Sequence, residues 1–168
     1  EIAWACRKDE DFRKIVNGAD MVLADGIGIV YGAKILGRPL KGKVAGCDFI
    51  TSVFARMAKT DKTVYLLGAK PGVAEKAAEN LTVQFPGLKI VGTADGYFKD
   101  DGPIIEKINA ASPDLLLVCL GAPKQEKWMA ANAQKLNVRL MAGLGGSLDV
   151  FAGVVERAPE KWQKLGLE

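Results

Sequence analysis

The sequence of 168 residues contains no histidine. Histidine is the side chain that most often acts as a general base or metal ligand near neutral pH. Its absence excludes a histidine base, a histidine-activated nucleophile and a histidine-ligated metal within this chain.

Cysteine is scarce as well. The three cysteines, Cys6, Cys47 and Cys119, are far apart and form no Cys-x-x-Cys pair. An odd number of separated cysteines argues against a disulfide framework and against structural zinc. We interpret them as reduced thiols of a cytoplasmic protein.

Long apolar runs and an excess of one charge are also missing. No run is long enough to span a bilayer, and no secretory signal is present. The net charge is +3, from 23 basic and 20 acidic residues, and no concentrated basic face indicates a nucleic-acid partner. Asp9-Glu10-Asp11 superficially resembles a metal-binding Asp-x-Asp sequence but lies in a charged, helical stretch. We therefore predict neither a metal site nor a cofactor.

What the sequence does contain is an alternation of short apolar runs with longer runs of helical period. This alternation predicts one α/β domain over residues 1–168, with a Rossmann-like, mostly parallel sheet and helices on both faces. Ligands of such sheets bind where the chain leaves the carboxyl ends of the strands. The predicted strands are 21–24, 64–67, 88–91, 115–120 and 139–142, so the loops after residues 24, 67, 120 and 142 are the candidate site.

The first of these loops places Asp25 beside Gly26 and Gly28. A carboxylate at the end of a strand can act as a general base, or it can accept a hydrogen bond from a ligand hydroxyl. The alternative, equally favoured by the pattern alone, is that Asp25 caps the following helix. Gly26, Gly28 and Gly32 are one residue away from the dinucleotide-binding spacing. A nucleotide- or dinucleotide-binding oxidoreductase is therefore the alternative function.

Two further loops contain lysines at predicted helix starts. Gly68 begins a glycine-rich turn that contains Lys70, where backbone N–H groups attract phosphate; a plain βα turn is the competing interpretation. Lys124 and Gln125 occupy the first turn of the helix that follows the run 115–120. We interpret the next two residues, Glu126 and Lys127, as solvated surface residues. We interpret Trp128 as a residue that packs inside the protein rather than one that stacks on a substrate.

The last loop contains Gly145, Gly146, Ser147 and Asp149. Its glycines and serine can form a backbone cradle for an anion or a ribose, and Asp149 can accept from ligand hydroxyls. The competing interpretation is that Ser147 is a helix N-cap.

Taken together, the loops resemble a known family. The blocks are Ala-Asp-Gly-x-Gly-Ile-Val (24–30), Val-Ala-Gly-x-Asp (44–48), Gly-Tyr-Phe (96–98), Gly-Ala-Pro-Lys-Gln-Glu-Lys-Trp (121–128), Gly-Gly-Ser-x-Asp-Val-x-Ala-Gly (145–153) and Arg-Ala-Pro (157–159). In this order they resemble the WecG/TagA/CpsF family of bacterial glycosyltransferases over nearly the whole chain.

This resemblance implies inverting, metal-independent sugar transfer from a UDP-sugar to a polyprenyl-diphosphate-linked sugar. The best-known members add N-acetylmannosamine to undecaprenyl-diphospho-N-acetylglucosamine during wall teichoic acid synthesis. It also implies a cytoplasmic enzyme that is peripheral to the inner face of the cell membrane. No nucleic-acid partner is expected, and homo-oligomerisation is left open.

Residue by residue, the resemblance implies that Asp25 is the catalytic base and that Gln125 is an active-site glutamine contacting substrate. The loop from Gly145 to Asp149 matches part of the nucleotide pocket. We assign substrate binding to these glycines, polar residues and an aromatic residue: Gly26, Gly28, Lys43, Gly68, Tyr97, Lys124, Gly145, Gly146, Ser147 and Asp149. Burial or a nearby negative charge is expected to raise the pKa of the base.

Three departures from the family pattern qualify these expectations. Lys43 stands where the family usually has an arginine, so the charge is kept and the bidentate fork is lost. A Thr-x-Asn segment that precedes the position of Glu1 in the family, and a basic amphipathic segment that follows the position of Glu168, are absent. We therefore expect a fragment of a longer chain, and a catalytically incomplete nucleotide-binding scaffold is a further alternative.

Overall fold

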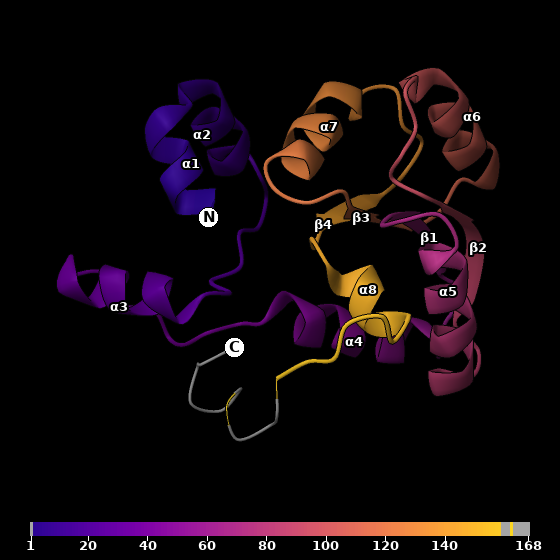
Figure 1. Cartoon of the computed structure of the whole chain (residues 1–168), viewed down its shortest axis with the longest axis horizontal. Coiled ribbons are helices and arrows are strands. Elements are labelled where there is room, and N and C mark those ends of the chain that lie inside the picture. The colour runs from indigo at the N-terminus through magenta and orange to yellow at the C-terminus, as the bar shows by residue number, and fades with distance from the viewer. Residues whose placement is uncertain (1, 159–161, 163–168) are drawn as a thin grey trace.

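The structure is a computed structural model that describes residues 2–158 and 162. At its centre lies a four-stranded, all-parallel sheet with the strand order β2-β1-β3-β4 (Figure 1). The strands are β1 (Thr63–Gly68), β2 (Lys89–Ala94), β3 (Leu115–Cys119) and β4 (Leu140–Gly143). Four of the five predicted strands are thereby confirmed, as is the Rossmann-like α/β class.

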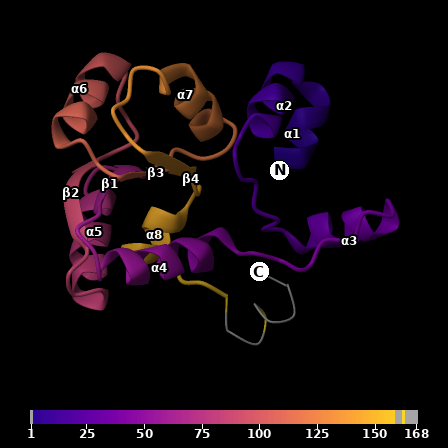
Figure 2. The ribbon, with the colours of Figure 1, turned by 180° about the vertical axis from the view of Figure 1, so that it is seen from behind.

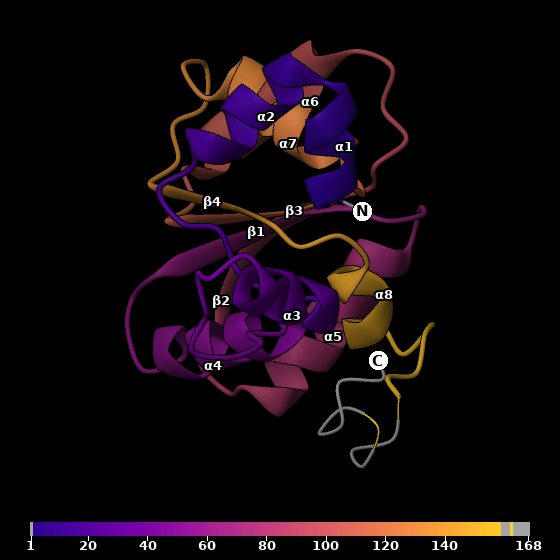
Figure 3. The same cartoon turned by 90° about the vertical axis from the view of Figure 1, so that its left-hand side faces the viewer.

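Helices cover both faces of this sheet, as Figure 3 shows. One layer holds α1 (Ile2–Lys8), α2 (Glu10–Asn17), α6 (Asp101–Ala111) and α7 (Lys124–Asn132). The other layer holds α3 (Ile27–Ile35), α4 (Gly46–Met57), α5 (Val73–Gln84) and α8 (Ser147–Phe151). Figures 1 and 2 show α3 extending away from the sheet, and none of its residues is buried. No helix among the described residues has both the length and the apolar character needed to cross a bilayer.

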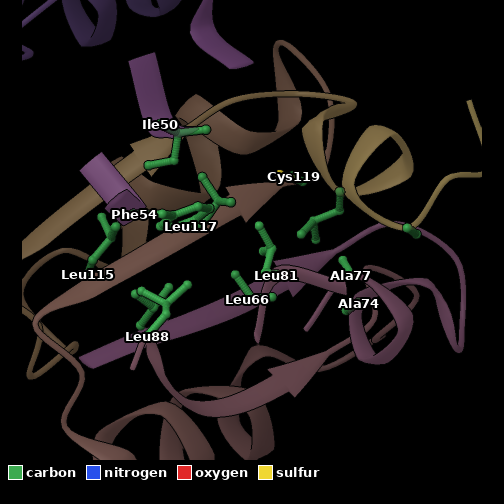
Figure 4. Close-up of a cluster of buried hydrophobic side chains, with 13 residues drawn as sticks. Ile50, Phe54, Leu66, Ala74, Ala77, Leu81, Leu88, Leu115, Leu117 and Cys119 are labelled. Carbon is green, nitrogen blue, oxygen red and sulfur yellow. The ribbon is translucent and has the colours of Figure 1, made fainter. Parts of the chain in front are cut away.

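The core divides into two clusters because successive residues of a strand point to opposite faces. From β1, Val64 and Leu66 pack with α4, α5 and α8 (Figure 4), whereas Tyr65 and Leu67 pack with α6 and α7. Every residue of β3 is buried. The continuous apolar run 115–120 had predicted this mid-sheet position, covered on both faces.

The prediction of a strand at 21–24 is wrong, since the structure has no strand there. Met21 and Val22 are 68% and 62% exposed. The Ala24 carbonyl accepts from Val44 N–H at 2.9 Å, a single contact that is not part of a ladder. An apolar run becomes a strand only where a neighbouring strand supplies its backbone partners, and none lies beside this run in the described part of the chain.

At the opposite edge, Asp114 holds together the starts of three strands. Its carboxylate accepts from Lys62 Nζ at 2.9 Å and from Thr63 N–H at 3.0 Å, and its carbonyl accepts from Leu140 N–H at 3.0 Å. Thr63 Oγ1 in return accepts from Asp114 N–H at 3.1 Å. The Lys62 hydrogen bond, followed by that from Thr63 N–H, lowers the pKa of the Asp114 carboxyl.

A lowered pKa in the folded state means that the ionised carboxylate stabilises the fold above about pH 4, where the unfolded chain is also ionised. Protonation removes this contribution as the pH falls through the folded-state pKa. Asp114→Asn should therefore lower the urea midpoint at pH 7, and its deficit relative to wild type should shrink towards pH 3. As a control, Asp11→Asn removes the carboxylate of an exposed ion pair and should change the midpoint little. A deficit that is independent of pH would contradict the assignment.

Candidate active site

A parallel sheet brings the carboxyl ends of all its strands to one edge, so the loops after β1, β2 and β3 meet there. Lys124 Nζ donates to the Gly96 carbonyl at 3.2 Å, and Gly96 N–H donates to the Ala69 carbonyl at 2.9 Å. The adjacent Tyr97 is 66% exposed. The structure therefore brings together Gly68, Tyr97 and Lys124 of the predicted site, and Lys70 is exposed in the same turn.

Gly68 has a structural reason to be glycine. Its φ is +133°, and a Cβ there would lie 2.2 Å from the carbonyl oxygen of Cys119. This close approach of β1 and β3 accounts for the residue without any ligand, and Gly68 does not line the pocket that contains Asp25.

Asp25 belongs to a second group of residues. Its Oδ2 accepts from the N–H of Gly46 at 3.1 Å, and Gly46 is the first residue of α4. The N-cap of α3 is Gly26 and makes no side-chain cap hydrogen bond. The expected alternative of Asp25 as a cap of the following helix is therefore wrong. Its carboxylate instead satisfies an N-terminal N–H of a helix that starts 21 residues later.

Asp25 is exposed and lines a pocket of about 260 Å³. Two cationic side chains, Lys43 and Arg157, lie on its wall, and Arg157 also pairs with Asp48. The lining residues are Asp25, Gly26, Lys43, Ala45, Gly46, Cys47 and Arg157. Of the predicted site it therefore contains Asp25, Gly26 and Lys43. Gly28 is exposed in the first turn of α3 and does not line it.

Four lining residues were not among the predicted ones: Ala45, Gly46, Cys47 and Arg157. Arg157 belongs to the Arg-Ala-Pro block (157–159), and the other three belong to the Val-Ala-Gly-x-Asp block (44–48). Both blocks therefore marked this region in the sequence, but neither marked these residues as part of the site. Pro159 of the first block lies outside the described residues.

The loop after β4 contacts Gly46, a residue that lines this pocket, through Leu144. A Cβ at Gly46 would lie 2.9 Å from Leu144 Cδ2 and 3.4 Å from Asp25 Oδ2. The absence of a side chain at Gly46 therefore allows Leu144 to pack where α4 meets the carboxylate. This contact joins the Asp25 loop, which lies outside the sheet, to the carboxyl edge of β4.

Gln125 lies on the other side of the same loop and is only 3% exposed. Its Oε1 accepts from Gly145 N–H at 2.9 Å, and its Nε2 donates to Glu126 Oε1 at 2.8 Å. The prediction that Glu126 is solvated surface is wrong, because its Oε2 is buried. Lys127, in contrast, is exposed and forms an ion pair with Asp9, as a surface residue would.

The remaining loop residues start α8. Gly146 is the N-cap of that helix, so the interpretation of Ser147 as an N-cap is wrong. Ser147 is 7% exposed, and its Oγ donates to the Leu144 carbonyl at 2.7 Å. Asp149 N–H donates to the Gly146 carbonyl at 3.1 Å. Gly145, Gly146, Ser147 and Asp149 thus form one tight turn beside Gln125.

Other expectations concern residues away from this turn. Trp128 is 7% exposed and its Nε1 donates to Asp101, which confirms packing. Asp9 accepts from Phe12 N–H as the N-cap of α2, and Glu10 and Asp11 lie in the first turn of that helix, so the prediction of a helical stretch here is confirmed. Within residues 2–158 and 162, no cluster of three or more acidic or cysteine side chains is placed to hold a metal ion.

The family model for the glycosyl transferase WecG/TagA/CpsF family matches residues 1–168. The chain belongs to this family. It is 36% identical over 168 residues to the N-acetylglucosaminyldiphosphoundecaprenol N-acetyl-beta-D-mannosaminyltransferase of Bacillus spizizenii (strain W23), and covers 65% of that relative. It is 35% identical over the same length to the protein of that name from Bacillus subtilis (strain 168), and covers 66% of it. The chain thus spans about two thirds of the length of these curated relatives, while all of its own residues are matched.

The two cysteines nearest the site differ in environment, which gives a direct test of the pocket. Burial raises the pKa of the Cys119 thiol to about 12, and only the thiolate is nucleophilic. Cys47 lines the pocket and is half-buried, as is Cys6 on α1. Iodoacetamide at pH 8 should label Cys6 and Cys47 and should spare Cys119, as measured by peptide mass spectrometry. All three should react in denaturant, and labelling of native Cys119 would contradict the packing at the end of β3.

Proposed function

We propose that the full-length protein transfers N-acetylmannosamine from a UDP-sugar to undecaprenyl-diphosphate-linked N-acetylglucosamine, with inversion at the anomeric carbon. The printed names of the relatives from Bacillus spizizenii and Bacillus subtilis support the transferred sugar and the acceptor. The observation that carries the proposal is the pocket in which Asp25 lies beside two cationic side chains, Lys43 and Arg157.

In this mechanism the acceptor hydroxyl oxygen attacks the anomeric carbon of the donor. Asp25 takes the hydroxyl proton as the new glycosidic bond forms, and the bond between the anomeric carbon and the phosphate oxygen breaks on the opposite face. UDP leaves with the bonding electrons. The hydrogen bond from Gly46 N–H to Oδ2 holds the carboxylate in a fixed position, which a general base requires.

The leaving diphosphate carries negative charge that the site has to stabilise. Lys43 and Arg157 supply positive charge to the wall of the pocket. Gly26 opens α3 in the same wall, and a Cβ there would meet nothing within 4 Å. The backbone at this point therefore has room for a ligand to approach it. We place the sugar and the diphosphate of the donor here.

We place the nucleoside towards the polar residues at the carboxyl edge of the sheet. Tyr97 offers an exposed ring, and Lys124 lies beside it on the Gly96 carbonyl. The turn that contains Gly145, Gly146, Ser147 and Asp149 lies between this group and the Asp25 pocket along the same edge. Because the acceptor is lipid-linked, we further propose that the protein works at the inner face of the cell membrane.

Replacing the base tests the mechanism directly. Asp25→Asn in the full-length protein should lower kcat by roughly 10²–10⁴-fold, the usual contribution of general-base catalysis. Affinity for UDP by calorimetry should change little, because the amide retains the size of the carboxylate. Asp20→Asn, a nearby exposed carboxylate outside the pocket, is the matched control and should leave both values unchanged. Turnover like wild type in Asp25→Asn would remove Asp25 from this role.

Nucleotide binding can be tested independently of turnover. If the donor diphosphate occupies the pocket, UDP should slow the alkylation of Cys47 and leave the alkylation of Cys6 on α1 unchanged. NAD at the same concentration should protect neither thiol. Protection by NAD and not by UDP would favour the oxidoreductase alternative.

A further inference from the structure

Glu126 forms an unusual contact for a residue at the start of a helix. Its Oε1 accepts from Gln125 Nε2 at 2.8 Å, while its Oε2 is buried with no hydrogen-bond partner among the described residues. Taking a carboxylate oxygen out of water without a donor costs stability. The described part of the chain shows no ion pair at Glu126 that offsets this cost.

The effect of Glu126 is to fix the orientation of the Gln125 amide. An amide presents a donor on one side and an acceptor on the other, and either orientation fits the same shape. A carboxylate accepts hydrogen bonds only, so it requires the Nε2 side of the amide. The Oε1 of Gln125 must then face Gly145 N–H, which it accepts at 2.9 Å. Gly143 makes room for this arrangement, since a Cβ there would lie 3.2 Å from Gln125 Nε2.

From Gly145 the contacts continue to the candidate base. Leu144, the preceding residue, lies against Gly46, where a Cβ would approach its Cδ2 to 2.9 Å. Gly46 N–H in turn donates to Asp25 Oδ2 at 3.1 Å. The start of α7, the turn after β4, the start of α4 and the Asp25 carboxylate are thus in continuous contact.

We propose that Glu126 is a positioning residue: it orients the Gln125 amide, which fixes the turn 143–146 and, through Leu144 and Gly46, the carboxylate of Asp25. Gln125 links Glu126 to this turn, because its Oε1 accepts from Gly145 N–H. The expected effect of Glu126 on turnover rests on the proposed function. Its expected effect on the turn 143–146 rests only on the described hydrogen bonds.

The test compares two variants of Glu126 in the full-length protein. Glu126→Ala removes the acceptor and should lower kcat by about 10- to 100-fold, the scale expected when a reacting group is misplaced by about an ångström. KM for the UDP-sugar should stay within about threefold of wild type, because the substrate contacts themselves remain. Glu126→Gln keeps an acceptor oxygen and should restore most of the turnover. Glu106→Ala, an exposed glutamate on α6, is the matched control and should behave like wild type.

A double-mutant cycle separates positioning from direct action. In a Gln125→Ala background, Glu126→Ala should cause little further loss, because both residues act through one hydrogen-bond chain. Losses that multiply independently would overturn the inference, as would a Glu126→Ala variant with the kcat of wild type.

A measurement without substrate separates this inference from the proposed function. Hydrogen exchange of the Gly145 amide, followed by NMR, should be at least about tenfold faster in Glu126→Ala and unchanged in Glu106→Ala. If wild type shows no transfer but Gly145 exchange responds in this way, the proposed function fails and the positioning by Glu126 stands. If exchange at Gly145 does not change, the inference is wrong even in an active enzyme.

Discussion

The hydrogen bond from Gly46 N–H to the Asp25 carboxylate is the interaction on which the site depends. Asp25 lies in a segment that forms no strand and that precedes a helix with no buried residue. Without a ladder to hold it, its position is set by α4, which is anchored in the core by Ile50 and Phe54. A carboxylate is also well matched to a helix N-terminus, where unpaired N–H groups carry partial positive charge. One contact therefore positions the candidate base and caps a core helix.

Steric room limits where that contact can form. At Gly46 and Gly143 a Cβ would lie within 3.0 Å of Leu144 Cδ2 and Met129 Cε, respectively. A side chain at either position would therefore require Leu144 or Met129 to move from the observed arrangement. Gly46 is the first residue of α4 and Gly143 is the last residue of β4. At the end of a helix or strand, the low intrinsic propensity of glycine destabilises the element little. The geometry of the site is thus fixed by packing against backbone as much as by hydrogen bonds.

Much of the fold and part of the site could be predicted from the sequence. The continuous apolar run 115–120 indicated a central strand. A strand covered on both faces has apolar side chains at every position, instead of alternating apolar and polar ones. The parallel order then placed the loops after β1, β3 and β4 at one edge. The run 21–24 misled because apolar character does not reveal whether a pairing partner is present. Glu126 was missed because a glutamate in a first helical turn is normally solvated, and only the tertiary position of Gln125 accounts for its burial.

A group-transfer reaction needs two substrates held at once. The polar residues of the candidate site form two groups, one around Tyr97 and Lys124 and one around Asp25 and Lys43. Two separate groups fit the binding of two substrates better than they fit a single dinucleotide site. The near-match Gly26, Gly28 and Gly32 lies at the start of and within α3, away from the point between β1 and β3 where a dinucleotide pyrophosphate would meet the sheet. At that point Gly68 and Cys119 are paired residues of β1 and β3, and their backbones approach closely. The Asp25 pocket lies beyond the other end of the turn after β4, joined to the sheet through Leu144. In the proposed mechanism, a donor along this edge has its anomeric carbon near the carboxylate, and the acceptor approaches from the exposed side of Asp25.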